Sequence, residues 1–146
     1  MPQPSTIERA RRDAREGKSA STQAGEFVRE ELHHIREGKH GARSTRQAIA
    51  IGLSKARRAG VDLAPPKSGR VSPKVKHQAE RDYARGHGQP SRRRSRATLM
   101  ALQKEPHSAA SPHAISTQTH RSAMRRTAAE RSTSARRAAT TRKERL

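Results

Sequence analysis

The chain has 146 residues, a formal net charge of +20, no cysteine and no tryptophan. Only 16 residues are Leu, Ile, Val or Phe, and burying so few large side chains cannot offset the roughly 1–2 kcal/mol of backbone entropy lost per ordered residue. The absence of cysteine excludes disulfides, thiol catalysis and Cys-based zinc sites. No apolar run approaches the roughly 20 residues of a membrane span. The composition therefore predicts at most a small ordered unit, in a cytoplasmic protein.

The first predicted helix is short and spans residues 6–16. Ser5 and Glu8 have the spacing of a capping box, and Gly17 suits the position after the helix end. Because Ile7 is its only large apolar residue, we expect this helix to be weak in isolation.

The second predicted helix spans residues 26–37. Val28, Leu32 and Ile35 recur at i, i+4 and i+7 and form one apolar face. Gly38 suits the position that ends a helix.

The third predicted helix spans residues 45–59. Ser44 and Gln47 have capping-box spacing, while Gly60 and Val61 match the C-terminal positions of a Schellman motif. At 100° per residue, its apolar and small residues share one face, with Ile51 at the edge: Ala48, Ile49, Gly52, Leu53, Ala56 and Ala59. Small residues on this face predict a close approach between helices.

The predicted fold class is mainly α, with a small helical hairpin and a long, largely disordered basic C-terminal tail. Nine of the 16 large apolar residues lie within 26–63, so the hairpin module is placed at 21–66, with a basic segment at 1–20 before it. The hairpin has two helices, or three if the first helix joins it, and is small enough to need a partner or a second copy. The tail comprises residues 67–146.

The tail carries most of the charge, with 20 Lys/Arg against 5 Asp/Glu in residues 67–146. Residues 73–85, 92–104 and 121–139 have helix-friendly composition but poor apolar faces. We expect weak helices there that form on a polyanion.

No catalytic or metal-binding pattern stands out, so we expect neither an enzyme nor a cofactor. None of the eight histidines has a recognised zinc-site spacing. His33-His34 is expected at the surface or half-buried, and acidic pairs such as Glu30-Glu31 are expected to face solvent.

The cations instead predict nucleic-acid binding through phosphates, because clustered Arg and Lys bind polyanions by counterion release. One aromatic residue in the tail, Tyr83, serves base stacking poorly, which favours duplex DNA over RNA or single strands. The alternatives are a solvated helix face and a merely soluble basic tail. The candidate phosphate-binding residues are Lys39, Arg43, Arg46, Arg57, Arg58, Arg92, Arg93, Arg94, Arg96, Arg125, Arg126, Arg136 and Arg137.

The segment STQAGEFVREELHHIREGKHGARSTRQAIAIGLSKARRAGVDLAPP, residues 21–66, resembles a family of small basic bacterial proteins, domain of unknown function 6496. QAIAIGLSKAR, residues 47–57, is the most specific part of the resemblance, and EGKHGARS also matches. The resemblance implies a bacterial origin and a modular unit at 21–66. It implies no activity and no site.

The function expected from these observations is a non-enzymatic, sequence-independent DNA-binding protein of the bacterial nucleoid. One alternative is a protein-interaction module, or self-association, through the apolar face of residues 45–59. Another is an RNA- or ribosome-associated factor. No membrane partner is expected, because the basic tail lacks an apolar anchoring face.

Overall fold

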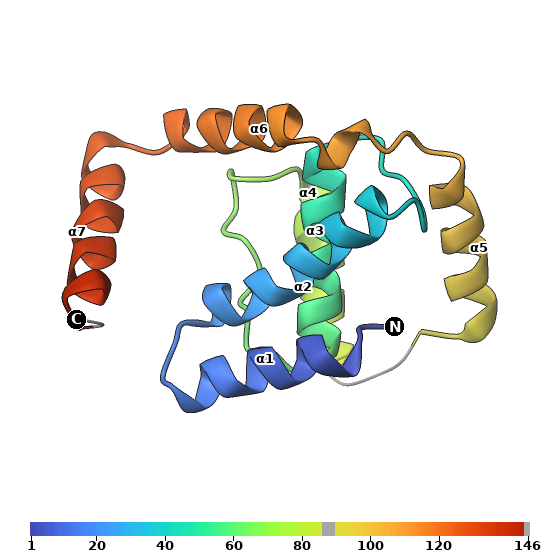
Figure 1. Ribbon diagram of the computed structural model, residues 1–146, viewed down its shortest axis with the longest axis horizontal. Helices are drawn as coiled ribbons and strands as arrows, with labels where there is room; N and C mark the ends of the chain where they lie inside the picture. Colours follow the sequence, from blue (N-terminus) through green and yellow to red (C-terminus); the bar gives the residue numbers. More distant parts are fainter. Residues whose placement is uncertain (86–89, 145–146) are drawn as a thin grey trace. The chain divides into compact units, whose positions relative to one another are not determined.

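The computed structural model describes residues 1–85 and 90–144, and all its regular elements are helical (Figure 1). Within these residues, seven α-helices and one 3-10 helix follow one another. Their bounds are α1 Pro4–Arg15, α2 Ala20–Arg36, α3 Thr45–Arg58, α4 Pro73–Arg85, α5 Arg92–Gln103, η1 Ser108–Ala110, α6 Pro112–Met124 and α7 Ala128–Glu144. None of the described helices combines the length and apolar character needed to cross a bilayer.

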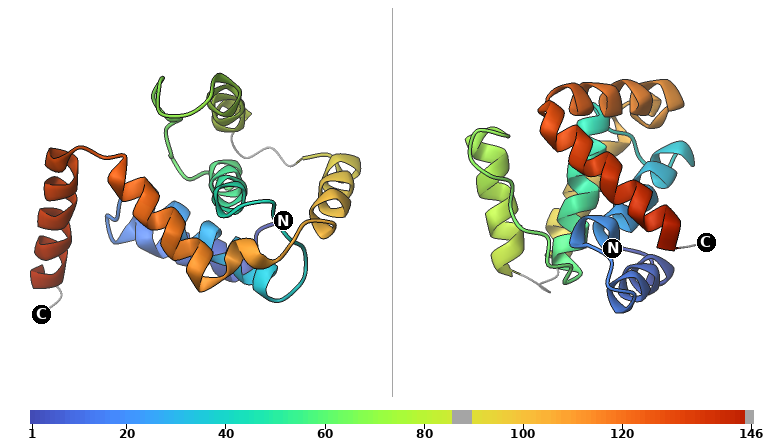
Figure 2. Two further views of the ribbon diagram at one scale, coloured as in Figure 1. Left: turned by 90° about the horizontal axis from the view of Figure 1, so that it is seen from above. Right: turned by 90° about the vertical axis from the view of Figure 1, so that its left-hand side faces the viewer.

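The chain forms two units, Met1–Ser111 and Pro112–Leu146. The first contains α1 to α5 and η1, and the second contains α6 and α7. In the first unit, α1 and α2 run antiparallel, α3 crosses α2, and α4 lies alongside α3 (Figures 1 and 2).

Helix α3 begins at the predicted residue and ends one residue before the predicted end, with Ala59 as its C-cap. The Ser44 hydroxyl accepts a hydrogen bond from the Gln47 N–H at 3.2 Å. At the other end, Gly60 has φ +92°, and the Val61 N–H bonds to the Ala56 carbonyl at 3.1 Å. These contacts confirm both the N-cap and the Schellman motif, because they satisfy backbone groups that the helix itself leaves unpaired.

The predicted apolar face of α3 packs on α2, and the small residues of this face set the distance between the two helices. Ala48, Gly52 and Ala56 are buried. A Cβ added at Gly52 would lie 2.6 Å from the Cα of Val28, so only glycine fits this crossing. The predicted close approach is confirmed.

The prediction of a two-helix hairpin is wrong, because neighbouring elements complete the core. Ala10 of α1 is buried with Phe27 and Ala56. Ala109 and Ala110 of η1 are buried with Ile35. Eight of the eleven buried hydrophobic residues among the described ones are alanines. The number of Leu, Ile, Val and Phe residues therefore underestimates the core.

Hydrogen bonds from α2 and α3 attach the 102–110 segment to the first unit. Arg36 Nε donates to the Ala110 carbonyl at 2.9 Å, and Thr45 Oγ1 donates to the Ala109 carbonyl at 2.6 Å. The Gly41 N–H donates to the Leu102 carbonyl at 2.8 Å, which fixes the C-terminal end of α5.

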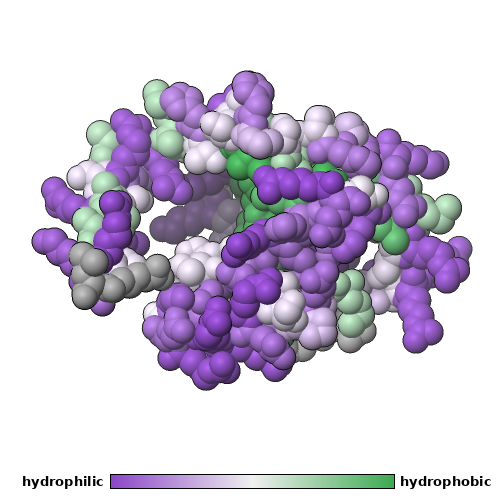
Figure 3. Space-filling model, in the orientation of Figure 1, coloured by the Kyte–Doolittle hydropathy of each residue, from purple (hydrophilic) through white to green (hydrophobic). Residues whose placement is uncertain are grey.

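The prediction of a largely disordered tail is also wrong, since α4 to α7 cover most of it. Local caps stabilise the ends of helices that contain few large apolar residues. Thr127 and Glu130 form a complete capping box: the Thr127 N–H donates to Glu130 Oε2 at 2.9 Å, and the Glu130 N–H donates to Thr127 Oγ1 at 3.2 Å. Hydrophilic side chains dominate the face shown in Figure 3, as the charge predicts.

Candidate nucleic-acid interface

The cations near the C-terminal end of α3 are bound within the fold. Lys55 Nζ lies 2.5 Å from Glu31 Oε2. Arg57 is buried and donates from Nε to the Leu63 carbonyl at 3.0 Å. Arg58 Nη2 lies 3.1 Å from Asp82 Oδ1. These three side chains hold elements together, so Arg57 and Arg58, two of the predicted phosphate-binding residues, are engaged within the fold.

Asp82 of α4 is the residue that organises this end of α3. It is 1% exposed and accepts hydrogen bonds from Ser54, Arg58 and Gln78. Burial alone would raise the pKa of Asp82, but these hydrogen bonds and the Arg58 charge together lower it. The carboxylate is therefore ionised at neutral pH and anchors α4 to α3.

The remaining candidates near α3 are exposed but scattered. Lys39 forms an ion pair with Glu37 at 2.8 Å, with both side chains about half exposed. Arg43 and Arg46 are exposed, and neither makes an ion pair within the described residues. An exposed ion pair contributes little to stability, so Lys39 remains available to a phosphate.

Helix α5 presents the densest group of exposed cations: Arg92, Arg93, Arg94 and Arg96. None of these guanidinium groups has an acidic partner among residues 1–85 and 90–144. No residue of α5 is buried. The helix begins after Ser91, whose hydroxyl accepts from the Arg94 N–H at 3.3 Å, so all four arginines lie in its first two turns.

This position is electrostatically unfavourable for the isolated protein. The N-terminal end of a helix carries a partial positive charge, and α5 has no acidic residue in its first turn. At a 1.5 Å rise per residue, the four arginines span about 6 Å. Arg92, Arg93 and Arg96 line one side of the helix, and B-DNA carries one phosphate charge per roughly 1.7 Å of its axis. A polyanion would relieve this repulsion.

The second unit carries cations around α7 and in the turn before it. Arg125 and Arg126 precede α7, and the Arg126 side chain reaches Ser134 Oγ at 3.5 Å. Arg136 and Arg137 are exposed on α7, which has no buried residue. Unlike α5, α7 has Glu130 in its first turn and Arg142 and Lys143 in its last turn, as the helix dipole favours.

The apolar face of residues 45–59, the alternative docking surface, is largely occupied by α2 and η1. Ile49, Ile51 and Leu53 at its margins are half-exposed. A partner that used the centre of this face would have to displace α2.

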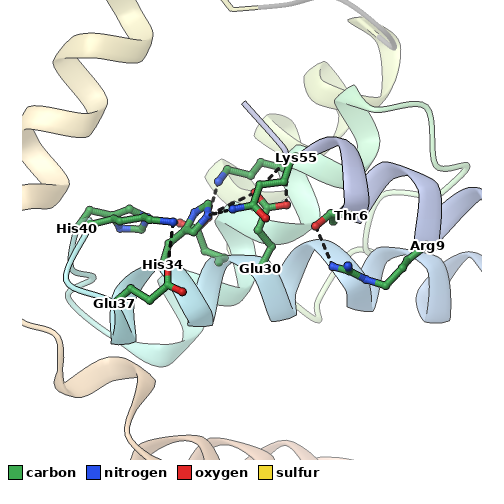
Figure 4. Close-up of polar contacts among 10 residues, drawn as sticks. Thr6, Arg9, Glu30, His34, Glu37, His40 and Lys55 are labelled. Atoms are coloured by element: carbon green, nitrogen blue, oxygen red, sulfur yellow. Dashed lines mark hydrogen bonds and ion pairs between the residues drawn. The ribbon is translucent and has the colours of Figure 1, made fainter.

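Sequence reasoning missed a group of buried polar side chains between α2 and the loop after it. Glu30 and Glu31, expected to face solvent, are 4% and 0% exposed. His34 and His40 point toward this group together with Lys55 (Figure 4). Glu31, His34 and His40 each place one ligand atom within 4.8 Å of the others and could hold a metal ion. A Glu-x-x-His pair is the sequence signal that could have revealed the group.

Residues 15–68 match the model of a family of unknown function, DUF6496. This match confirms the resemblance recognised in the sequence, and it covers α2 and α3 with the turns beside them. No curated protein and no solved structure matches the chain. The comparisons therefore bring no activity, ligand or partner to this molecule.

Proposed function

We propose that this protein is a non-enzymatic nucleic-acid-binding protein that contacts the phosphate backbone of duplex DNA without reading its sequence, as nucleoid-associated proteins do. The first unit presents the α5 arginines, and the second presents cations in the turn before α7 and on α7. Each group acts by neutralising phosphates and releasing counterions. The nucleoid is the corresponding place in a bacterial cell.

The observation that carries this proposal is the charge arrangement of α5. Four exposed arginines stand in the first two turns of a helix, at its positive end, without an acidic partner in the described residues. Arg also binds phosphate in a bidentate manner, which requires no contact with the bases.

The test measures binding of the full chain to duplex DNA by fluorescence anisotropy across a salt series. A variant with Arg92, Arg93, Arg94 and Arg96 replaced by Ala is compared with a matched control. The control replaces four other exposed arginines, Arg11, Arg12, Arg15 and Arg29, by Ala. Both variants lose the same net charge.

We expect the α5 variant to flatten the slope of log K against log salt by up to about 3.6, because each phosphate contact contributes roughly 0.9. The control should lose much less. Equal losses in both variants would show that total charge, rather than α5, drives binding. Tighter binding to structured RNA than to duplex DNA at equal salt would favour the RNA-associated alternative.

A further inference from the structure

The cluster of Glu31, His34 and His40 is separate from the proposed nucleic-acid interface. Glu31 and His34 stand one turn apart on α2, and His40 follows in the loop after this helix. Glu31 is fully buried and His40 is 5% exposed, whereas the His34 side chain is 13% exposed. Two imidazoles and a carboxylate are a ligand set typical of zinc and related divalent ions.

The hydrogen bond of His40 leaves its other ring nitrogen free to bind a ligand. His40 Nδ1 lies 3.0 Å from the Gly41 carbonyl oxygen. A carbonyl can only accept, so Nδ1 carries the proton, and Nε2 of the neutral ring presents a lone pair. Metal-binding histidines commonly have this arrangement, in which the outer hydrogen bond fixes the tautomer.

The Glu31 carboxylate is satisfied on one oxygen only. Oε2 is bound by Lys55 Nζ at 2.5 Å. Oε1 is buried and receives no hydrogen bond from the described residues. It lies 3.2 Å from His40 Nε2, but the geometry is not that of a hydrogen bond between these atoms. A buried carboxylate oxygen without a donor is costly, and a cation bound beside it would offset that cost, as a protonated His40 would.

The distance between Glu31 and His40 fits a shared metal, and a third ligand atom lies nearby. With metal–ligand bonds of about 2.0–2.1 Å, tetrahedral ligand atoms lie about 3.3 Å apart, which matches the 3.2 Å between Glu31 Oε1 and His40 Nε2. A proton shared by these two groups would need no third donor. The third donor is nevertheless present, because a ring nitrogen of His34 lies within 4.8 Å of both atoms.

The surroundings supply both charge balance and access. Glu30 is buried, and its Oε1 lies 3.8 Å from His34 Nε2. The negative charge of Glu30 offsets the positive charge of Lys55. His34 and Glu30 also line an open pocket of about 360 Å³ between α1 and α2. An ion or a water molecule can approach His34 from this side.

We propose that Glu31, His34 and His40 bind one divalent transition-metal ion of the zinc class, with water completing the coordination. The ion links α2 to the loop that follows it. That loop holds α5, since the Gly41 N–H next to His40 bonds to the Leu102 carbonyl. The site therefore has a structural role, and it is independent of whether the protein binds DNA.

The test titrates the full chain with Co²⁺, whose visible d–d bands report a four-coordinate site, and then displaces it with Zn²⁺. We expect one equivalent per chain. His34→Ala and Glu31→Gln should each weaken binding by about 100-fold or more, because even the loss of a residue that only orients a metal ligand costs roughly 10–100-fold. His33→Ala is the matched control, because His33 is the exposed neighbour of His34 on the same helix, and it should bind as the wild type does.

Thermal unfolding gives a second measurement that does not rely on spectra. Zn²⁺ should raise the Tm of the wild type and of His33→Ala, but not that of Glu31→Gln, which keeps the shape of the side chain. Absence of four-coordinate Co²⁺ bands would overturn the proposal. So would equal losses in His33→Ala and His34→Ala, because surface histidines would then account for the binding.

Discussion

Helices α3 and α5 each carry four cations, and three of those in α3 are bound within the fold, whereas none of those in α5 has an acidic partner in the described residues. In α3, Lys55, Arg57 and Arg58 lie near the C-terminal end and bind carboxylates or carbonyls of other segments. In α5, all four arginines lie near the N-terminal end and have no acidic partner in the described residues. The same residue types therefore serve cohesion in one helix and remain available to a ligand in the other.

The largest expected effect on stability comes from disrupting the packing of α3 on α2. Gly52→Ala should lower the free energy of unfolding by about 3 kcal/mol, because a Cβ there would overlap the backbone of Val28. Gly25→Ala, also on α2, is the matched control, since its Cβ would meet no atom within 4 Å beyond the helix's own backbone and its chain neighbours, and it should stabilise the protein by up to about 1 kcal/mol. Urea denaturation of both variants measures the contrast. A neutral Gly52→Ala would mean that α2 and α3 are not in close contact.

A smaller effect is expected from the carboxylate that holds the end of α3. Asp82→Asn should cost about 1–2 kcal/mol at neutral pH, because it weakens the hydrogen bonds from Ser54 and Arg58. The pKa of Asp82 is lowered in the folded state, so its contribution is present above the unfolded value of about 3.9 and is lost as pH falls through the folded value.

Urea denaturation of the wild type and Asp82→Asn between neutral pH and acid measures this dependence. The two curves should converge at low pH, where the wild-type carboxyl is also uncharged. A constant difference across the whole range would show that the charge of Asp82 does not stabilise the fold.

The smallest expected effect on stability concerns the N-terminal caps of α3 and α5. Ser44 in α3 is followed three residues later by Gln47, whereas Ser91 in α5 is followed by Arg94. Arg94→Glu completes a capping box and places a negative charge at the N-terminal end, so it should stabilise α5 by about 0.5–1 kcal/mol.

The same substitution should weaken DNA binding, because it removes a cation and adds an anion. Circular dichroism measures the helix content, and anisotropy measures the affinity. Arg94→Gln is the control that keeps capping-box chemistry without the added charge. Stronger DNA binding by Arg94→Glu would contradict the role proposed for the α5 arginines.

Several features of the fold follow from short stretches of sequence. The Ser44 cap, the Gly60–Val61 ending and the small-residue face of α3 were predicted because each depends on residues within a few positions of one another. The core was underestimated, because alanines such as Ala10 and Ala110 bury little area individually and become important only when several helices meet.

The candidate site was predicted only in part for a similar reason. The dense arginine group of α5 is visible in the sequence, and its exposure agrees with expectation. The contacts of Arg57 and Arg58 within the fold were not predictable, because Asp82 is distant in sequence and Leu63 belongs to a loop. The burial of Glu31 beside His40 was not predictable either, because no local pattern specifies the path of the loop that carries His40.

The sequence by itself determined the helical character, the caps of α3 and the large excess of positive charge, all of which arise from local periodicity, capping and composition. Only the tertiary structure decided which charges are bound and which are available. Lys55 meets Glu31 and Arg58 meets Asp82 across 24 residues of chain. The physical reason is that charge is a property of each residue, whereas burial and pairing belong to the packed arrangement of several helices.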